Sequence, residues 1–211
     1  MEILRKMSIK SSWEELKNAA DSGMLADILK SGDQILVTLK DGRKIALDAG
    51  RDASGKFYFI CHDCLAKGSM NRKGANKGGW RDSDMRAFLN AEIFSLFPDD
   101  VQAVMRPTKI VQVVRGETLE SEDKLFLLSA TQVFGDAGCC CERGFNDSQI
   151  DIFSVERNRV KECANKGTAY WWLRSPYASD SNFFCCVYTD GTIYDSYAYY
   201  SYGVAPAFCI E

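Results

Sequence analysis

Histidine is nearly absent from this chain of 211 residues, in which His62 is the only one. Nucleophilic catalysis by serine or cysteine needs a neighbouring base, most often histidine, so a Ser-His-Asp or Cys-His group could form only around His62. The paired acids Asp99 and Asp100 stand at an expected helix start, where the helix dipole favours negative charge. We therefore predict a protein that is not an enzyme and has no catalytic residues.

The sequence also lacks a complete metal-binding motif. Cys61-His62-Asp63-Cys64 has the C-x-x-C spacing, but a zinc site needs four ligands and a second pair of this kind is missing. The run Cys139–Cys141 could complete a site only if the fold brought the two regions together. An odd count of nine cysteines without a regular framework indicates reduced thiols. We predict small buried thiols, with no metal ion and no cofactor.

Targeting, membrane and nucleic-acid signals are missing as well. The first ten residues contain no apolar core of a signal peptide, and no apolar run reaches membrane-spanning length. The net charge of −3 gives no electrostatic footprint for nucleic acid. We therefore expect no nucleic-acid partner and no membrane insertion, in a protein that is either cytoplasmic or part of a virion.

The last forty residues have the most unusual composition. After Arg174 there is no Lys, Arg, Gln, Met, Leu or Trp, and the only Glu is the final residue. Seven of the nine tyrosines lie in the same segment, together with many Ser, Asp and Asn residues. Binding loops use this combination, because Tyr offers a large rigid contact and small polar side chains offer adaptable hydrogen bonds. A solvated low-complexity loop would explain the Ser and Asp but not the aromatic residues.

Codon usage offers a second explanation for the same bias. Every residue from Ser175 to Ile210 can be encoded with a pyrimidine in the third codon position, whereas Lys, Glu, Gln, Met and Trp cannot, and these five are missing. Randomising the adenines of AAY codons would produce this set of residues.

The residues on both sides of the segment resemble a known family. WWLRSP, a Tyr/Ser/Asn/Asp-rich run and GVAPAFCI are similar to the C-terminus of diversity-generating-retroelement variable proteins. GGWRDSDMRAFLN and DKLFLLSATQVFG resemble a lectin-like domain of gut bacteria and their phages, so the likeness covers residues 24–211. It implies a C-type-lectin-like fold whose last segment is altered by reverse transcription with errors at adenines.

This resemblance implies a division of the C-terminal segment into framework and displayed side chains. The framework comprises Trp171, Trp172, Arg174, Pro206 and Phe208, with Leu173 and Val204, and Arg174 is expected to pair with an internal carboxylate or carbonyl. Inward or turn positions are Phe184, Val187, Gly191, Ile193, Ala198 and Gly203. The displayed, ligand-binding set within 177–202 is Tyr177, Ser179, Asp180, Asn182, Phe183, Cys186, Tyr188, Thr189, Tyr194, Asp195, Ser196, Tyr197, Tyr199, Tyr200 and Tyr202.

The expected ligand is a protein or a glycan on a cell surface, because flat aromatic rings suit both. Two alternatives stay open. One is an enzyme on the same fold: either a relative of the formylglycine-generating oxidases, which use a cysteine pair for which Cys185-Cys186 would be the candidate, or a metal-dependent relative. A fixed tyrosine strip could instead be a homo-oligomer interface. Calcium-dependent lectins also share the fold, but their Glu-Pro-Asn-type and Trp-Asn-Asp motifs are missing, so we predict no calcium site.

The pattern of elements predicts an α+β protein made of antiparallel strands and short helices. Residues 1–23 read as an N-terminal helical extension and 24–211 as one domain. Helices are expected at 12–21, 24–29, 83–97 and 99–105, and Leu65–Gly79 and Gly135–Asn146 as loops. Residues 152–162 read as helical or extended. Strands are expected at 33–40 and 44–49, joined by the Asp41-Gly42 turn, and at 57–62, 109–115, 125–129, 170–173 and 204–210. Asp190-Gly191 predicts a further hairpin.

Overall fold

Two sheets form the framework of the computed structural model, which describes residues 12–138, 147–163 and 167–211. The first sheet has the order β1-β2-β3-β13 and is antiparallel throughout. The second has the order β11-β10-β9-β12-β4, and its one parallel pair joins β12 to β9. The strands of the first are β1 (Gln34–Thr38), β2 (Lys44–Arg51), β3 (Phe57–Cys61) and β13 (Ala207–Phe208). Those of the second are β4 (Ala66–Gly68), β9 (Trp171–Pro176), β10 (Phe183–Val187), β11 (Ile193–Tyr197) and β12 (Tyr202–Val204).

Two short hairpins and several short helices complete the architecture. β5 (Thr108–Val114) pairs with β6 (Glu117–Asp123), and β7 (Lys161–Glu162) pairs with β8 (Thr168–Ala169). The helices are α1 (Trp13–Asp21), α2 (Leu25–Ile28), α3 (Asp84–Phe88), the π-helical turn η1 (Leu89–Ile93), α4 (Phe94–Leu96), α5 (Asp99–Val104), α6 (Ala130–Phe134) and the 3-10 turns η2 (Asp151–Ser154) and η3 (Glu156–Arg159). The protein is therefore mixed α+β with mostly antiparallel strands. Within the described ranges, no helix is both long and apolar enough to cross a membrane.

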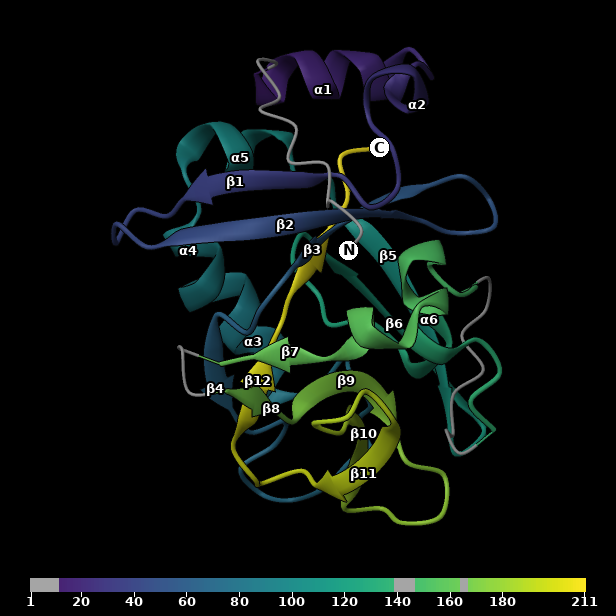
Figure 1. Cartoon of the computed structure of the whole chain (residues 1–211). Helices are drawn as coiled ribbons and strands as arrows, with labels where there is room; N and C mark the ends of the chain where they lie inside the picture. The colour runs from purple at the N-terminus through teal and green to yellow at the C-terminus, as the bar shows by residue number, and fades with distance from the viewer. Residues whose placement is uncertain (1–11, 139–146, 164–166) are drawn as a thin grey trace.

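The end of the chain connects the two sheets. Residues 204–210 do not form the single closing strand that the sequence predicts. β12 lies in the five-stranded sheet and β13 in the four-stranded sheet, and Pro206 lies between them. Proline cannot donate a backbone hydrogen bond, so the ladder breaks there and the chain crosses over. In Figure 1 this last, yellow stretch runs from the lower sheet up to β3.

Buried aromatic side chains fill the space along this crossing. Trp171, Trp172 and Phe208 are fully buried, and Phe59 stacks on Phe208 with ring centroids 5.3 Å apart. Trp13 of α1 packs against the same two phenylalanines, at 5.5 and 6.0 Å. The N-terminal helix therefore packs onto the core that the C-terminal strand helps to build.

Arg174 lies buried within β9, as the framework interpretation expects. Its guanidinium donates to the carbonyl of Leu127 at 2.9 Å, to Oε1 of Gln132 at 2.6 Å and to the carboxylate of Asp147 at 2.5 Å. A buried charge is tolerated only when it is paired and hydrogen-bonded. The expected pairing of Arg174 with an internal carboxylate and a carbonyl is confirmed.

Several sequence-predicted elements have the expected positions. Ser12 caps α1 through a complete capping box, and Asp41-Gly42 turns between β1 and β2. The long helix after Ser83 is present but contains the π-helical turn η1. The prediction that 65–79 is entirely a loop is wrong, because β4 pairs with β12 there. Two further elements, β6 and α6, were not predicted.

Candidate functional site

The hairpin of β10 and β11 forms the base of the candidate site. The strands pair antiparallel from Phe183 opposite Tyr197 to Val187 opposite Ile193. In the turn, the Asp190 carboxylate accepts hydrogen bonds from the backbone N–H and hydroxyl of Thr192, at 2.9 and 2.7 Å. Gly191 adopts a φ of 89°, a left-handed conformation that favours glycine. These bonds fix the turn, so residues 183–197 form a defined hairpin.

Asn76 holds the loop that enters the hairpin. Its buried side-chain amide donates to three backbone carbonyls, those of Phe183 at 2.6 Å, Asp180 at 2.8 Å and Tyr177 at 3.3 Å. Its backbone N–H donates to the carbonyl of Ser181 at 2.7 Å. A loop without its own ladder has carbonyls that need partners. One side chain from a distant segment supplies those partners here.

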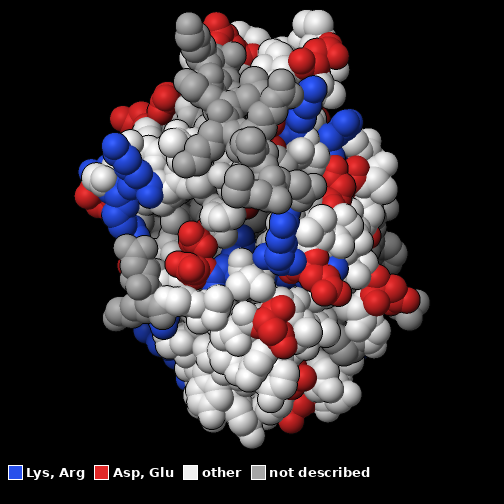
Figure 2. Space-filling model, in the orientation of Figure 1, with Lys and Arg blue, Asp and Glu red and all other residues white. Residues whose placement is uncertain are grey.

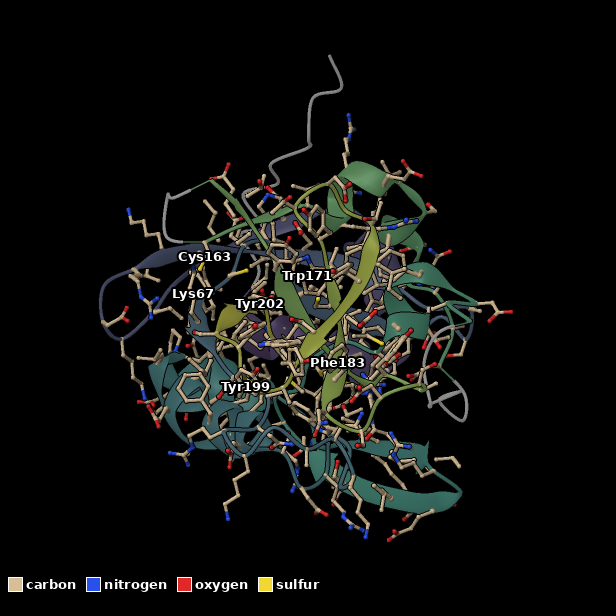
Figure 3. All side chains as sticks on the ribbon, turned by 90° about the horizontal axis from the view of Figure 1, so that it is seen from below. Lys67, Cys163, Trp171, Phe183, Tyr199 and Tyr202 are labelled. Carbon is tan, nitrogen blue, oxygen red and sulfur yellow. The ribbon has the colours of Figure 1, made fainter. Side chains whose placement is uncertain are left out.

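Aromatic rings from this segment form one continuous group, which we call the aromatic cluster. Neighbouring rings lie 4.3 to 6.3 Å apart, in edge, tilted and stacked arrangements. Its members are Tyr170, Trp172, Tyr177, Phe183, Tyr188, Tyr194, Tyr197, Tyr199, Tyr200 and Tyr202. Figure 3 shows Tyr199, Tyr202 and Phe183 at the end of the molecule that faces the viewer.

The cluster is buried on one side and exposed on the other. Trp172 is fully buried, whereas the exposed fractions of Tyr194, Tyr197, Tyr199 and Tyr200 are 52%, 39%, 49% and 43%. These four are a majority of the seven large apolar side chains that are exposed in the described residues; the others are Met24, Leu36 and Val155. A concentration of this kind on a soluble protein usually marks a binding surface.

The structure separates the predicted display set into three groups. Exposed members are Ser179, Asn182, Tyr194, Tyr197, Tyr199 and Tyr200. Half-buried members are Tyr177, Asp180, Phe183, Tyr188, Thr189, Asp195 and Tyr202. Two members, Cys186 and Ser196, are buried, and the prediction that they are displayed is wrong.

Both errors have a physical reason. Cys186 lies on β10, between β9 and β11, and residues 184–187 are buried on both faces of the sheet. Burial also raises the pKa of the Cys186 thiol, which makes it a poor nucleophile. Ser196 is covered because its hydroxyl hydrogen-bonds the phenol of Tyr202 at 2.9 Å. The predicted inward positions fit better, since Phe184, Val187, Gly191, Ala198 and Gly203 are buried and Ile193 is half-buried.

Three phenols of the cluster, those of Tyr170, Tyr199 and Tyr202, have a raised pKa. A hydrogen bond with Tyr188 raises the pKa of Tyr170, and burial raises the pKa values of Tyr199 and Tyr202. Figure 2 shows that this lower end, over β9–β11, is largely uncharged, with scattered acidic groups on its face and basic groups at its left margin. The site therefore offers aromatic contact and uncharged hydrogen-bonding groups.

A group of hydrogen-bonded polar side chains lies on the four-stranded sheet. The imidazole Nδ1 of His62 lies 2.8 Å from Oδ2 of Asp48, and the Gln34 amide donates to Asp48 at 2.8 Å. All three line a cavity of about 360 Å³. The hydrogen bond with Asp48 raises the pKa of His62. Burial alone would raise the pKa of Asp48, but its bond with His62 and the charge of Lys161 lower it.

In the described ranges, no group of three or more His, Cys, Asp or Glu residues is placed so that it could hold a metal ion. Cys139–Cys141 lie outside those ranges.

Sequence reasoning missed two residues of the candidate site. Tyr170 directly precedes the tryptophan pair, and its position could have indicated membership in the cluster. Asn76 stands in a Gly- and Lys-rich stretch with no pattern that marks it.

Comparison with known proteins yields one match. A family model described as "Domain of unknown function (DUF6273)" matches residues 54–211, which include both sheets except β1 and β2. No curated protein and no solved structure matches the chain.

Replacing Asn76 by Ala tests how the entrance loop is held. Three carbonyls lose their buried donor, so we expect a loss of about 1–3 kcal/mol in the free energy of unfolding, measured with urea. Amide exchange at 177–183 should accelerate. Asn182→Ala is the matched control, because Asn182 is exposed in the same loop; its change should stay within about 0.5 kcal/mol. Equal losses for the two variants would contradict the anchoring role of Asn76.

His62→Gln tests the pair with Asp48 through pH. The folded pKa of His62 is raised, so its stabilising contribution is complete below the unfolded value of 6.5 and disappears as pH rises through the folded value. The contribution of Asp48 is present above 3.8 and disappears as pH falls. The free energy of unfolding of wild type should exceed that of His62→Gln by a larger margin at about pH 5 than at about pH 9. A difference that does not vary with pH would rule out the charged pair.

Proposed function

The chain belongs to the family described as Domain of unknown function (DUF6273), and from this premise we propose that it is a binding protein whose aromatic cluster contacts a ligand. The observation that carries the proposal is a continuous set of rings, exposed at Tyr194, Tyr197, Tyr199 and Tyr200 and anchored on buried Trp172. Rigid aromatic side chains bind with little loss of conformational entropy.

The proposed fold is C-type-lectin-like, and the proposed origin of the segment is retroelement diversification. Both are supported by the resemblance of WWLRSP and GVAPAFCI to the retroelement variable proteins, and the mixed α+β architecture is compatible with the proposed fold. The framework residues are buried in β9, β12 and β13, whereas most positions proposed to vary are exposed or half-buried. A framework of this kind lets side chains change without altering the core.

A protein ligand is favoured over a small molecule. None of the cavities lined by Cys64, Arg51, His62 or Tyr58 includes an exposed tyrosine of the cluster. Small ligands occupy concave pockets, whereas a broad aromatic surface suits the core of a protein interface. The segment is rich in tyrosine, and tyrosine is enriched among the residues that contribute most to the binding energy of protein interfaces.

Randomising Tyr194, Tyr197, Tyr199 and Tyr200 together tests the proposed separation of framework and display. These side chains are exposed, so we expect most variants to fold with a melting temperature close to that of wild type. Selection against immobilised streptavidin should yield binders. The matched control library varies four exposed positions elsewhere, Glu14, Glu92, Lys109 and Glu120, and should yield none.

Two outcomes would contradict the proposal. General unfolding of the tyrosine library would show that these rings belong to the core. Light scattering tests the other outcome. Wild type would be a stable oligomer, and the double variant Tyr197→Ser with Tyr199→Ser would be a folded monomer. The cluster would then be a fixed oligomer interface. A folded monomer in both cases supports the display of a ligand-binding surface.

The coding locus tests the proposed diversification. We expect a near-copy of the segment that encodes 170–211 beside a reverse transcriptase gene, with differences confined to adenines. Adenine-containing AAY codons should stand in the copy at the exposed positions, and not at Cys186 if burial restricts it. Sequencing of an intact locus that lacks both the copy and the reverse transcriptase would rule out this origin.

A further inference from the structure

Two cysteines that are far apart in the sequence lie side by side in the fold. Cys64 and Cys163 form a parallel β-bridge, and the N–H of Cys64 donates to the carbonyl of Glu162 at 2.9 Å. The side chain of Asp63 accepts from the N–H of Glu162 at 2.9 Å. The segments Asp63-Cys64 and Glu162-Cys163 are therefore held together by one backbone hydrogen bond and one hydrogen bond to a side chain.

The two cysteine side chains lie next to each other, because they are partners across the parallel bridge. The thiol of Cys163 also donates to the carbonyl of Ala66 at 3.9 Å. The other side of Cys64 is closed by Gly203, where an added Cβ would lie 2.4 Å from the sulfur. Cys64 is thus confined to a position facing Cys163. A disulfide needs this kind of close, opposed placement.

The pair borders a cavity. Cys64 and Cys163 are 7% and 3% exposed, and both line a cavity of about 460 Å³, together with Arg43, Lys44 and Lys67 and the acidic residues Asp63 and Glu162. Cys61, the other half of the C-x-x-C sequence, does not line this cavity and is 1% exposed. Figure 3 shows Cys163 and Lys67 near each other at one side of the viewed face. The functional partner of Cys64 is therefore Cys163 rather than Cys61.

We propose that Cys64 and Cys163 form a dithiol site that reacts with anionic small-molecule disulfides such as glutathione disulfide. The Cys163 thiolate attacks one sulfur of the small disulfide, whose S–S bond breaks, releasing one small thiol and leaving a mixed disulfide. Cys64 then attacks the Cys163 sulfur and displaces the second small thiol. The two protons of the protein thiols pass to the two released thiols, and the protein gains an internal disulfide.

The order of attack follows from the environment of Cys64. Burial raises its pKa to about 12. Only a thiolate attacks efficiently, so we assign Cys64 the second step, in which the sulfur that it attacks is already its neighbour across the β-bridge. The exposed side chains of Lys44 and Lys67 attract the carboxylates of the incoming disulfide.

Peptide mapping of the full chain tests the proposal without any substitution. After incubation with glutathione disulfide and blocking of free thiols, tryptic peptides 57–67 and 162–166 should appear as one disulfide-linked species that dithiothreitol separates. Peptide 57–67 also contains Cys61, so the same linkage must persist in Cys61→Ser. Separate peptides, with Cys64 and Cys163 both alkylated in full, would overturn the proposal.

Three variants test the mechanism. Cys64→Ser should retain glutathione on Cys163 as a stable adduct, whereas Cys163→Ser should acquire much less on Cys64; equal adducts would overturn the assigned order. Lys67→Ala should slow the reaction with glutathione disulfide by several-fold but leave unchanged the rate with uncharged hydroxyethyl disulfide. Equal slowing with both reagents would overturn the role of charge. Urea unfolding checks that each variant is folded.

Discussion

The structure depends on the burial of the two runs that flank the tyrosine-rich segment. β9 enters the segment with Trp171, Trp172 and Arg174 inside, and the chain leaves it through β12 and β13 with Phe208 inside. A fully buried aromatic side chain removes 150–250 Å² from water, a gain of about 4–6 kcal/mol at the usual coefficient. The flanking runs can therefore hold the intervening residues whatever their exposed side chains are.

The same constraint explains why the segment is ordered although its composition is that of a loop. Its backbone bonds are made by the β10–β11 ladder and the Asp190 turn, and by Asn76 from outside the segment. None of these bonds uses the side chains of Tyr194, Tyr197, Tyr199 or Tyr200. Whether the backbone of the segment is ordered thus depends little on which side chains it exposes. That independence is what a surface with replaceable contacts requires.

Much of the local structure could be predicted from the sequence, because local chemistry determines it. The Ser12 cap, the Asp41-Gly42 hairpin and the Asp190-Gly191 turn each depend on residues a few positions apart. Contacts between distant segments could not be predicted in this way. β4 is recognisable only beside β12, and Asn76 only beside the carbonyls that it meets. The buried position of Cys186 depends on β10 lying between two strands and that of Ser196 on the contact with Tyr202, and the alternation of residues reveals neither.

The cysteine pair and the aromatic cluster share a structural element. Gly203 of β12 touches the Cys64 sulfur, and Tyr202 beside it stacks on Tyr170 at 5.0 Å. Strand β12 also pairs with β4 next to Lys67, which lines the cysteine cavity. Packed interiors have little room to absorb a shift, so a movement of the Cys64 sulfur toward Cys163 changes its packing against Gly203. One route from the cysteine pair to the aromatic cluster therefore runs along β12, from Gly203 through Tyr202 to Tyr170.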